Sequence, residues 1–170
     1  MGSYIGIVAI YIKKLDSFNG KILNMIDKLK RCGIKLSNVN ILEDFPMEAS
    51  VNTNCFSSSN CLFTISDNRY FRGIVLEIPE SELLNNNYSN EKINEVDGWL
   101  FALMKKICAT INCDYIFCDN EADILDFQYN CYDGSFNTNF SIFINNIDKT
   151  IVLNDWNIDG LSKRTAYYNN

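Results

Sequence analysis

The hydrophobic residues of this chain recur at two spacings, which predicts both strands and helices. Residues 4–13, YIGIVAIYIK, are almost continuously apolar and rich in Ile and Val, a pattern typical of a strand covered on both faces in the middle of a sheet. In residues 17–32 the apolar side chains fall at helical spacing, as Ile22 and Ile26 do, and Gly33 stands where helices commonly end. We therefore expect a central strand followed by an amphipathic helix.

The middle of the chain predicts three further strands and one long loop. Residues 39–43 form a short apolar run that ends before Pro46, because proline cannot donate a hydrogen bond to a neighbouring strand. Residues 47–60 are rich in Ser and Asn, which predicts a polar loop. Residues 61–66 and 73–78 are apolar runs on either side of a turn-favouring Asp-Asn-Arg stretch. They predict an antiparallel hairpin.

The last third of the chain predicts a second helix, a short strand and a final hairpin. The helix covers residues 91–111, and its apolar residues share one stripe. These residues are Ile93, Val96, Leu100, Leu103, Met104, Ile107 and Ile111. Residues 115–118 predict a short strand, and residues 140–144 and 150–153 predict a hairpin around an Asn-Asn turn. A polar and aromatic tail follows.

Together these elements predict an α+β fold with a mixed or mainly antiparallel sheet and two main helices packed on one of its faces. The chain has 170 residues, 47% of them hydrophobic, which suits a single domain over residues 1–170. Its longest apolar run, residues 7–12, is too short to span a membrane, and no signal peptide is expected. We therefore expect a cytoplasmic protein that does not bind membranes.

The cysteine and histidine contents limit the chemistry. The seven cysteines are odd in number and show no CxxC spacing, so we expect free, mostly buried thiols in a reducing compartment and no structural zinc. The chain has no histidine, which excludes Ser-His-Asp triads, Cys-His pairs and the common zinc hydrolase motifs. Mechanisms that need only carboxylates, as in glycosidases or magnesium-dependent phosphoryl transfer, remain open.

The stretch CDYIFCDNEADI sets Asp119, Glu121 and Asp123 at alternate positions after the predicted strand. They are similar to the start of a calcium loop, but Ile124 occupies the position of the required glycine and Asn130 that of the bidentate glutamate. No metal and no cofactor is therefore expected. Two other roles remain open: the three acids can serve as acid and base in a carboxylate enzyme, or they can stabilise the N-terminus of a short helix.

The overall charge adds a binding role for these acids. The formal net charge is -6, and such a surface repels nucleic acid and attracts a basic partner. We interpret Asp119, Glu121, Asp123 and Asp126 as a surface that binds a basic protein domain. A small-molecule-binding regulatory domain is the alternative, because strands and helices in this order also build ligand pockets. An exposed edge strand can also pair two copies into a homodimer.

Three features resemble one protein family. They are the start MGSYIGIVAIYI followed by an amphipathic helix, the DYIFCDNEADI stretch after the second long helix, and the histidine-free α+β character. They are similar to the small immunity proteins of bacterial polymorphic toxin systems, and most nearly to the group called immunity protein 64. The resemblance implies a non-enzymatic protein that binds a cognate toxin domain, often a nuclease, and blocks it in the producing cell.

Overall fold

The structure is a computed structural model that describes residues 3–12, 18–37, 47–52, 57–67, 71–87, 89–131 and 140–154. The side chains of residues 18–23, 66–67 and 128–131 lie outside this description. The strands are β1 (Tyr4–Tyr11), β2 (Ile34–Ser37), β3 (Met47–Asn52), β4 (Ser57–Asp67), β5 (Arg72–Pro79), β6 (Tyr115–Asn120), β7 (Ile142–Asn145) and β8 (Thr150–Leu153). The helices are α1 (Phe18–Arg31), α2 (Glu80–Leu84), α3 (Asn90–Ile111) and α4 (Ile124–Cys131).

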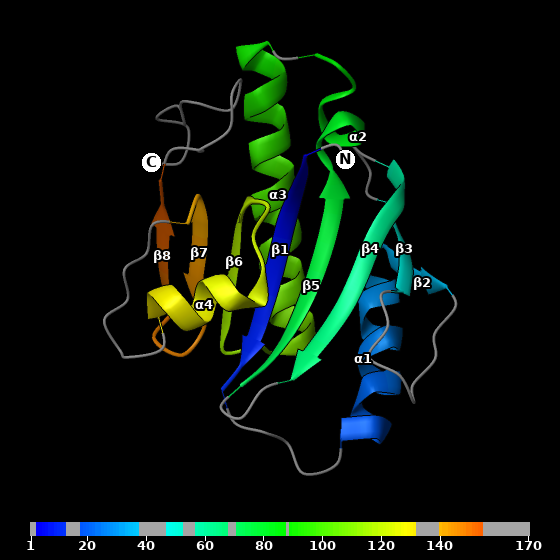
Figure 1. Cartoon of the computed structure of the whole chain (residues 1–170), viewed down its shortest axis with the longest axis vertical. Helices are drawn as coiled ribbons and strands as arrows, with labels where there is room; N and C mark the ends of the chain where they lie inside the picture. The colour runs from blue at the N-terminus through cyan, green and yellow to red at the C-terminus, as the bar shows by residue number, and fades with distance from the viewer. Residues whose placement is uncertain are drawn as a thin grey trace.

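The eight strands of the described residues form one sheet in the order β2-β3-β4-β5-β1-β6-β7-β8, and each neighbouring pair is antiparallel (Figure 1). β1 lies between β5 and β6, and its six inner residues are buried. A strand covered on both faces needs apolar residues at successive positions, which explains the continuous apolar run in residues 4–13. The predicted α+β class, the antiparallel sheet and the interior position of this strand are confirmed.

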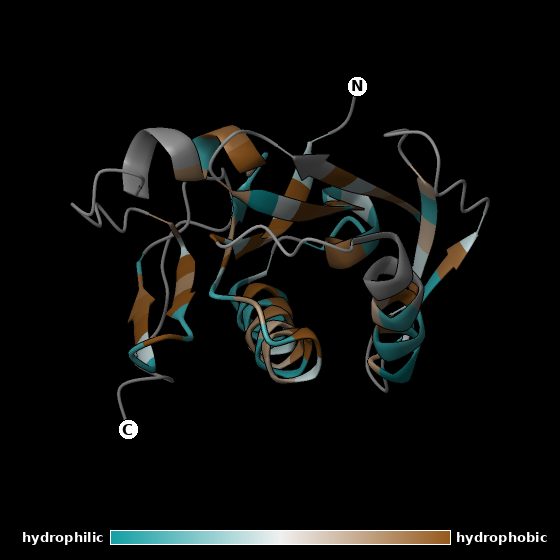
Figure 2. Ribbon diagram, turned by 90° about the horizontal axis from the view of Figure 1, so that it is seen from below, coloured by the Kyte–Doolittle hydropathy of each residue, from teal (hydrophilic) through white to brown (hydrophobic). Residues whose placement is uncertain are grey.

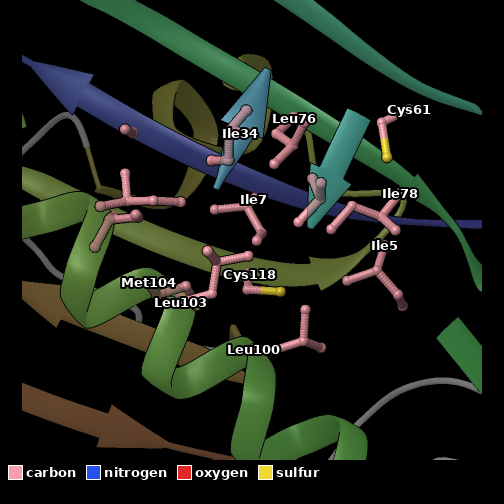
Figure 3. Close-up of a cluster of buried hydrophobic side chains, with 14 of the residues drawn as sticks. Ile5, Ile7, Ile34, Cys61, Leu76, Ile78, Leu100, Leu103, Met104 and Cys118 are labelled. Carbon is pink, nitrogen blue, oxygen red and sulfur yellow. The ribbon is translucent and has the colours of Figure 1, made fainter. Parts of the chain in front are cut away.

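The sheet separates two clusters of buried side chains. Successive residues of β1 point to opposite faces, so Ile5 and Ile7 join the larger cluster while Val8 and Ile10 join the smaller one. Figure 3 shows part of the larger cluster, in which side chains of α3 lie against those of β1, β5 and β6. Both faces of the sheet centre are thus closed to water.

The two long helices both contribute to the larger cluster. α3 buries every residue of its predicted stripe. α1 contributes Met25 and Leu29, and Ile26 packs against the cluster partly buried, while the side chain of Ile22 lies outside the described part. α4 instead buries Phe127 in the smaller cluster. Figure 2 shows α4 on one side of the sheet and the two long helices on the other. A helix on the α4 side was not predicted.

The prediction of a loop over residues 47–60 is wrong. β3 and β4 run through this segment and pair with each other. In β3 the side chains of Met47, Ala49 and Val51 are buried and alternate with exposed or half-buried polar ones. This period of two is typical of a strand with one solvated face, but the small polar residues that dominate the segment concealed it. The strand predicted over residues 39–43 lies outside the described residues.

Both predicted hairpins are confirmed. β4 pairs with β5 and β7 pairs with β8, each in antiparallel register, and Pro79 is the last residue of β5. The strand predicted at residues 115–118 is also present, but β6 continues to Asn120. This extension places Asp119 inside the sheet rather than after it.

Candidate functional site

The four acids of the predicted binding surface lie where β6 ends and α4 begins. Asp119 is the last residue but one of β6. Glu121 and Asp123 lie in the connection between β6 and α4, and Asp126 lies in the first turn of α4. We call residues 119–126 the acidic loop. One end of the acidic loop belongs to β6 and the other to α4. Between these ends, its contacts with β1 fix its position.

Hydrogen bonds fasten the acidic loop to the start of β1. The Glu121 amide donates to the carbonyl oxygen of Tyr4 over 2.9 Å, and the Tyr4 hydroxyl donates to the Glu121 carbonyl oxygen over 3.4 Å. The Ser3 hydroxyl donates to the side-chain oxygen of Asn120 over 2.8 Å. Glu121 itself has φ 51°, the left-handed conformation that reverses the chain direction in turns. These contacts hold the loop backbone against the sheet.

Gly6 allows the acidic loop to approach this closely. A Cβ atom on Gly6 would lie 2.9 Å from the carbonyl carbon of Ala122 and closer still to its carbonyl oxygen. No other residue type fits such a distance between backbones. Ala122 is itself 2% exposed, so the centre of the loop is packed onto β1 while the acidic residues on either side of it point away.

Two of the acids form the N-terminal cap of α4. An Asp123 carboxylate oxygen accepts from the Ile124 amide over 2.5 Å, and an Asp126 carboxylate oxygen accepts from the Asp123 amide over 2.7 Å. The second bond has the geometry of a capping box, in which a side chain three residues into the helix binds the amide of the cap residue. The proposal that these acids stabilise a helix start therefore describes part of their role.

The Asp119 carboxylate accepts hydrogen bonds from neighbouring residues at the end of the sheet. One of its carboxylate oxygens accepts from the Asn120 amide over 2.8 Å and from the Ser141 hydroxyl over 2.9 Å. Burial raises the pKa of the Asp119 carboxyl above its ordinary value, although these hydrogen bonds oppose the shift. Glu121 and Asp123 are exposed, whereas Asp119 and Asp126 are half-buried. The four acids are thus adjacent, but Glu121 and Asp123 are more accessible to a partner than Asp119 and Asp126 are.

A fifth acid joins this group, and sequence analysis missed it. Glu77 on β5 pairs with Gly6 on the side opposite Asp119, and burial followed by the charge of Asp123 raises its pKa. Burial, followed by the charges of Glu77 and acids of the loop, raises the pKa of Tyr4 to about 12. The one available signal was a lone acid in the apolar stretch GIVLEI, which the pairing of the strands brings beside the loop.

The described residues of the acidic loop and its surroundings do not form a metal-binding cluster. They contain no group of three or more His, Cys, Asp or Glu side chains arranged to hold a metal ion. A hollow of about 630 Å³ lies elsewhere, along one side of α3, beside Gly98 and Trp99. Its described lining comes from that one helix, without polar groups that converge from several elements as small-molecule sites require. None of the described helices is long and apolar enough to span a membrane.

Comparison of the sequence with known protein families identifies a match. The model of the family described as immunity protein 64 matches residues 40–164. The chain belongs to the immunity protein 64 family. This match confirms the resemblance, and it covers the acidic loop but not β1. No curated protein and no solved structure matches the chain.

Proposed function

We propose that this protein binds a cognate bacterial toxin domain and neutralises it by direct contact. Membership of the immunity protein 64 family supports the toxin partner. The observation that carries the proposal is the acidic loop, fastened to β1 over Gly6, with Glu121 and Asp123 exposed beside Asp119 and Asp126. Because the backbone of the acidic loop is already held in place, binding costs less conformational entropy. The protein acts without catalysis, inside the cell that makes the toxin.

The charge of this surface favours a basic toxin domain. The net charge of the chain is -6, and complementary charges raise the association rate of two proteins more than they raise affinity. A nuclease fits this partner well, because domains that bind nucleic acid carry basic surfaces. The four acids then occupy, for the toxin, the position of the phosphates of its substrate.

The test uses a toxin domain that we expect a gene next to this one to encode. The variant with Asp119→Asn, Glu121→Gln, Asp123→Asn and Asp126→Asn removes four charges, and asparagine is as good a helix cap as aspartate. We expect association roughly tenfold slower or more at low salt, with a flatter salt dependence, and weaker protection of cells that express the toxin. Stopped-flow or surface-based kinetics give the rates.

A matched control removes four charges elsewhere. Asp27→Asn, Glu91→Gln, Glu95→Gln and Asp148→Asn change exposed acids of α1, of α3 and of the turn before β8. This control should associate much faster than the acidic loop variant. Equal slowing in both variants would mean that net charge alone acts. Unchanged rates and unchanged protection in the loop variant would remove the acidic loop from the mechanism, and a neighbouring gene without a toxin would count against the function itself.

A further inference from the structure

A single row of residues crosses the sheet and reaches the acidic loop. Residues that pair in neighbouring strands share a face of the sheet. The pairs Glu48↔Leu62, Leu62↔Glu77, Glu77↔Gly6 and Gly6↔Asp119 therefore place one residue from each of five consecutive strands in line. We call Glu48, Leu62, Glu77 and Asp119 the cross-sheet row. It lies on the face that also carries the acidic loop.

The outer part of this face, over β2, β3 and β4, has no cover among the described residues. α4 and the smaller cluster close the part over β1, β6, β7 and, at Val75, β5, but that cluster contains no residue of β2, β3 or β4. Glu48 is exposed, Leu62 is 43% exposed and Glu77 is half-buried. In Figure 1 this uncovered part includes the surface of β4, on the far side of β5 from α4. The row thus leads from the acidic loop onto a sheet surface that no described element covers.

The uncovered surface faces away from the long helices. Figure 2 shows α1 and α3 under the sheet and the outer strands turned down towards them, so that the α4 side is the outer side of the curve. A surface of this shape can enter a concave site of another protein. It combines carboxylates with an exposed apolar side chain, as protein interfaces combine a polar rim with an apolar centre.

We infer that the toxin contact extends from the acidic loop along the cross-sheet row, with Leu62 as its apolar anchor between Glu48 and Glu77. This inference rests on the proposed function and names the contact face. Charge selects the occupant: two copies of this face would bring acids against acids, whereas a basic domain complements them. Lys35 is exposed on β2 two residues from Ser37, which pairs with Glu48, so the acidic contact ends at that edge.

The decisive variant changes the row and leaves the acidic loop intact. It carries Glu48→Gln, Leu62→Ser and Glu77→Gln, and its affinity is measured against the same neighbouring toxin domain. We expect Kd to rise roughly tenfold or more, mostly through faster dissociation, because loss of an apolar anchor acts on the lifetime of a complex. The matched control carries Glu91→Gln, Glu95→Gln and Ile151→Ser, which remove two acids and one exposed apolar residue from α3 and β8.

The outcomes separate the two proposals. An unchanged Kd in the row variant, together with slow association of the acidic loop variant, would overturn the extension and leave the proposed function in place. A wild-type protein that does not bind the toxin domain would overturn the proposed function. Equal weakening by the control would also contradict the row. If the row variant does not fold, carbodiimide cross-linking of the wild-type complex decides: links from toxin lysines to Glu48 or Glu77 support the extension, and their absence contradicts it.

Discussion

Asp119 shows how one residue can serve both the fold and a binding surface. Its carboxylate accepts hydrogen bonds from the Asn120 amide and the Ser141 hydroxyl, yet burial raises its pKa above the ordinary value of 3.8. A carboxyl with a raised pKa holds its proton more tightly in the folded state than in the unfolded state. The charged form of Asp119 therefore costs stability at neutral pH.

The first prediction concerns Asp119→Asn. The folded protein binds more protons at this residue between the ordinary and the raised pKa, so its contribution to the free energy of unfolding falls as pH rises through that interval. Asparagine keeps an oxygen for both hydrogen bonds and has no charge. We expect the stability of the variant, relative to wild type, to increase as pH rises from about 4 to 7. Urea unfolding at several pH values measures this difference.

Glu82→Gln provides a control of opposite sign. Burial raises the pKa of Glu82, but hydrogen bonds from Ser58, Asn60 and the Ser59 amide together lower it below the ordinary value. Its contribution to stability is present above the ordinary pKa and is lost as pH falls. The Glu82→Gln variant should therefore lose stability, relative to wild type, as pH rises through the interval just below the ordinary pKa of 4.5, and the difference should stay constant above it. Parallel pH profiles in the two variants would contradict both assignments.

At this scale the sequence predicts less than the structure contains. Asp119, Glu121, Asp123 and Asp126 could be identified because they are close together in the chain. Glu77 could not, since it reaches the same place through the pairing of β5 with β1. One of the two hydrogen bonds to the Asp119 carboxylate comes from Ser141, 22 positions away, and no local pattern encodes such a partner.

Among the elements, the contact between the acidic loop and β1 is the one on which the proposed function depends most. A Cβ atom at Gly6 would meet the Ala122 backbone, which cannot rotate away as a side chain can. A Cβ atom at Gly73 would instead meet the side chain of Ile124, 2.8 Å from its Cγ1 atom. Both glycines face the smaller cluster, but the obstacles differ in how easily they move.

The second prediction compares Gly6→Ala with Gly73→Ala. Overpacking against a backbone forces the loop off the strand, so Gly6→Ala should cost about 3 kcal/mol or more of stability. Gly73→Ala should cost about 1 to 2 kcal/mol, because the Ile124 side chain can adopt another rotamer. Chemical denaturation gives both values. Loop displacement should also slow association of Gly6→Ala with the toxin domain. A Gly6→Ala protein as stable as Gly73→Ala would show that the loop is not fixed in this way.

Elements with a long, regular pattern of apolar residues could be predicted from the sequence, and elements with a short or interrupted pattern could not. The apolar run of β1 and the stripe of α3 are long, so both appeared in the sequence. β3 was missed because its buried residues alternate with polar ones in a segment rich in Ser and Asn. α4 was proposed only as a short helix start, and its place on the outer face follows from how the acidic loop crosses β1.

For the whole molecule, the sequence predicts which residues are buried better than it predicts which surface contacts a partner. The net charge of -6 can be read from the sequence, and our proposal of a basic partner starts from it. The cross-sheet row does not follow from composition, because it needs the strand order and the register of five strands. A shift of one residue in any pairing would turn that strand's residue to the other face. The row is therefore a property of the fold.

The last prediction concerns the thiols. Five cysteines in the described part of the chain are buried and not in disulfides: Cys32, Cys61, Cys108, Cys113 and Cys118. Burial raises the pKa of Cys61, and a hydrogen bond to Cys108 followed by burial holds the pKa of Cys113 well above its usual value. Because the thiolate is the reactive form, the raised pKa values slow the reaction of Cys61 and Cys113. The hydrogen bond with Cys113 lowers the pKa of Cys108, but all five thiols are buried and should react with a small disulfide reagent only when the protein opens.

Titration of the native protein tests whether the thiols are structural. Of the seven cysteines in the chain, at most two should react rapidly without denaturant, and all should react once the protein is unfolded. For a stability of about 5 kcal/mol, reaction through global unfolding is slowed by more than a thousandfold. The rate of the slow class should then rise with denaturant in step with unfolding measured by fluorescence. Rapid reaction of most thiols in the native protein would instead mean that the core opens locally, and the sheet would not be a rigid support for the acidic loop.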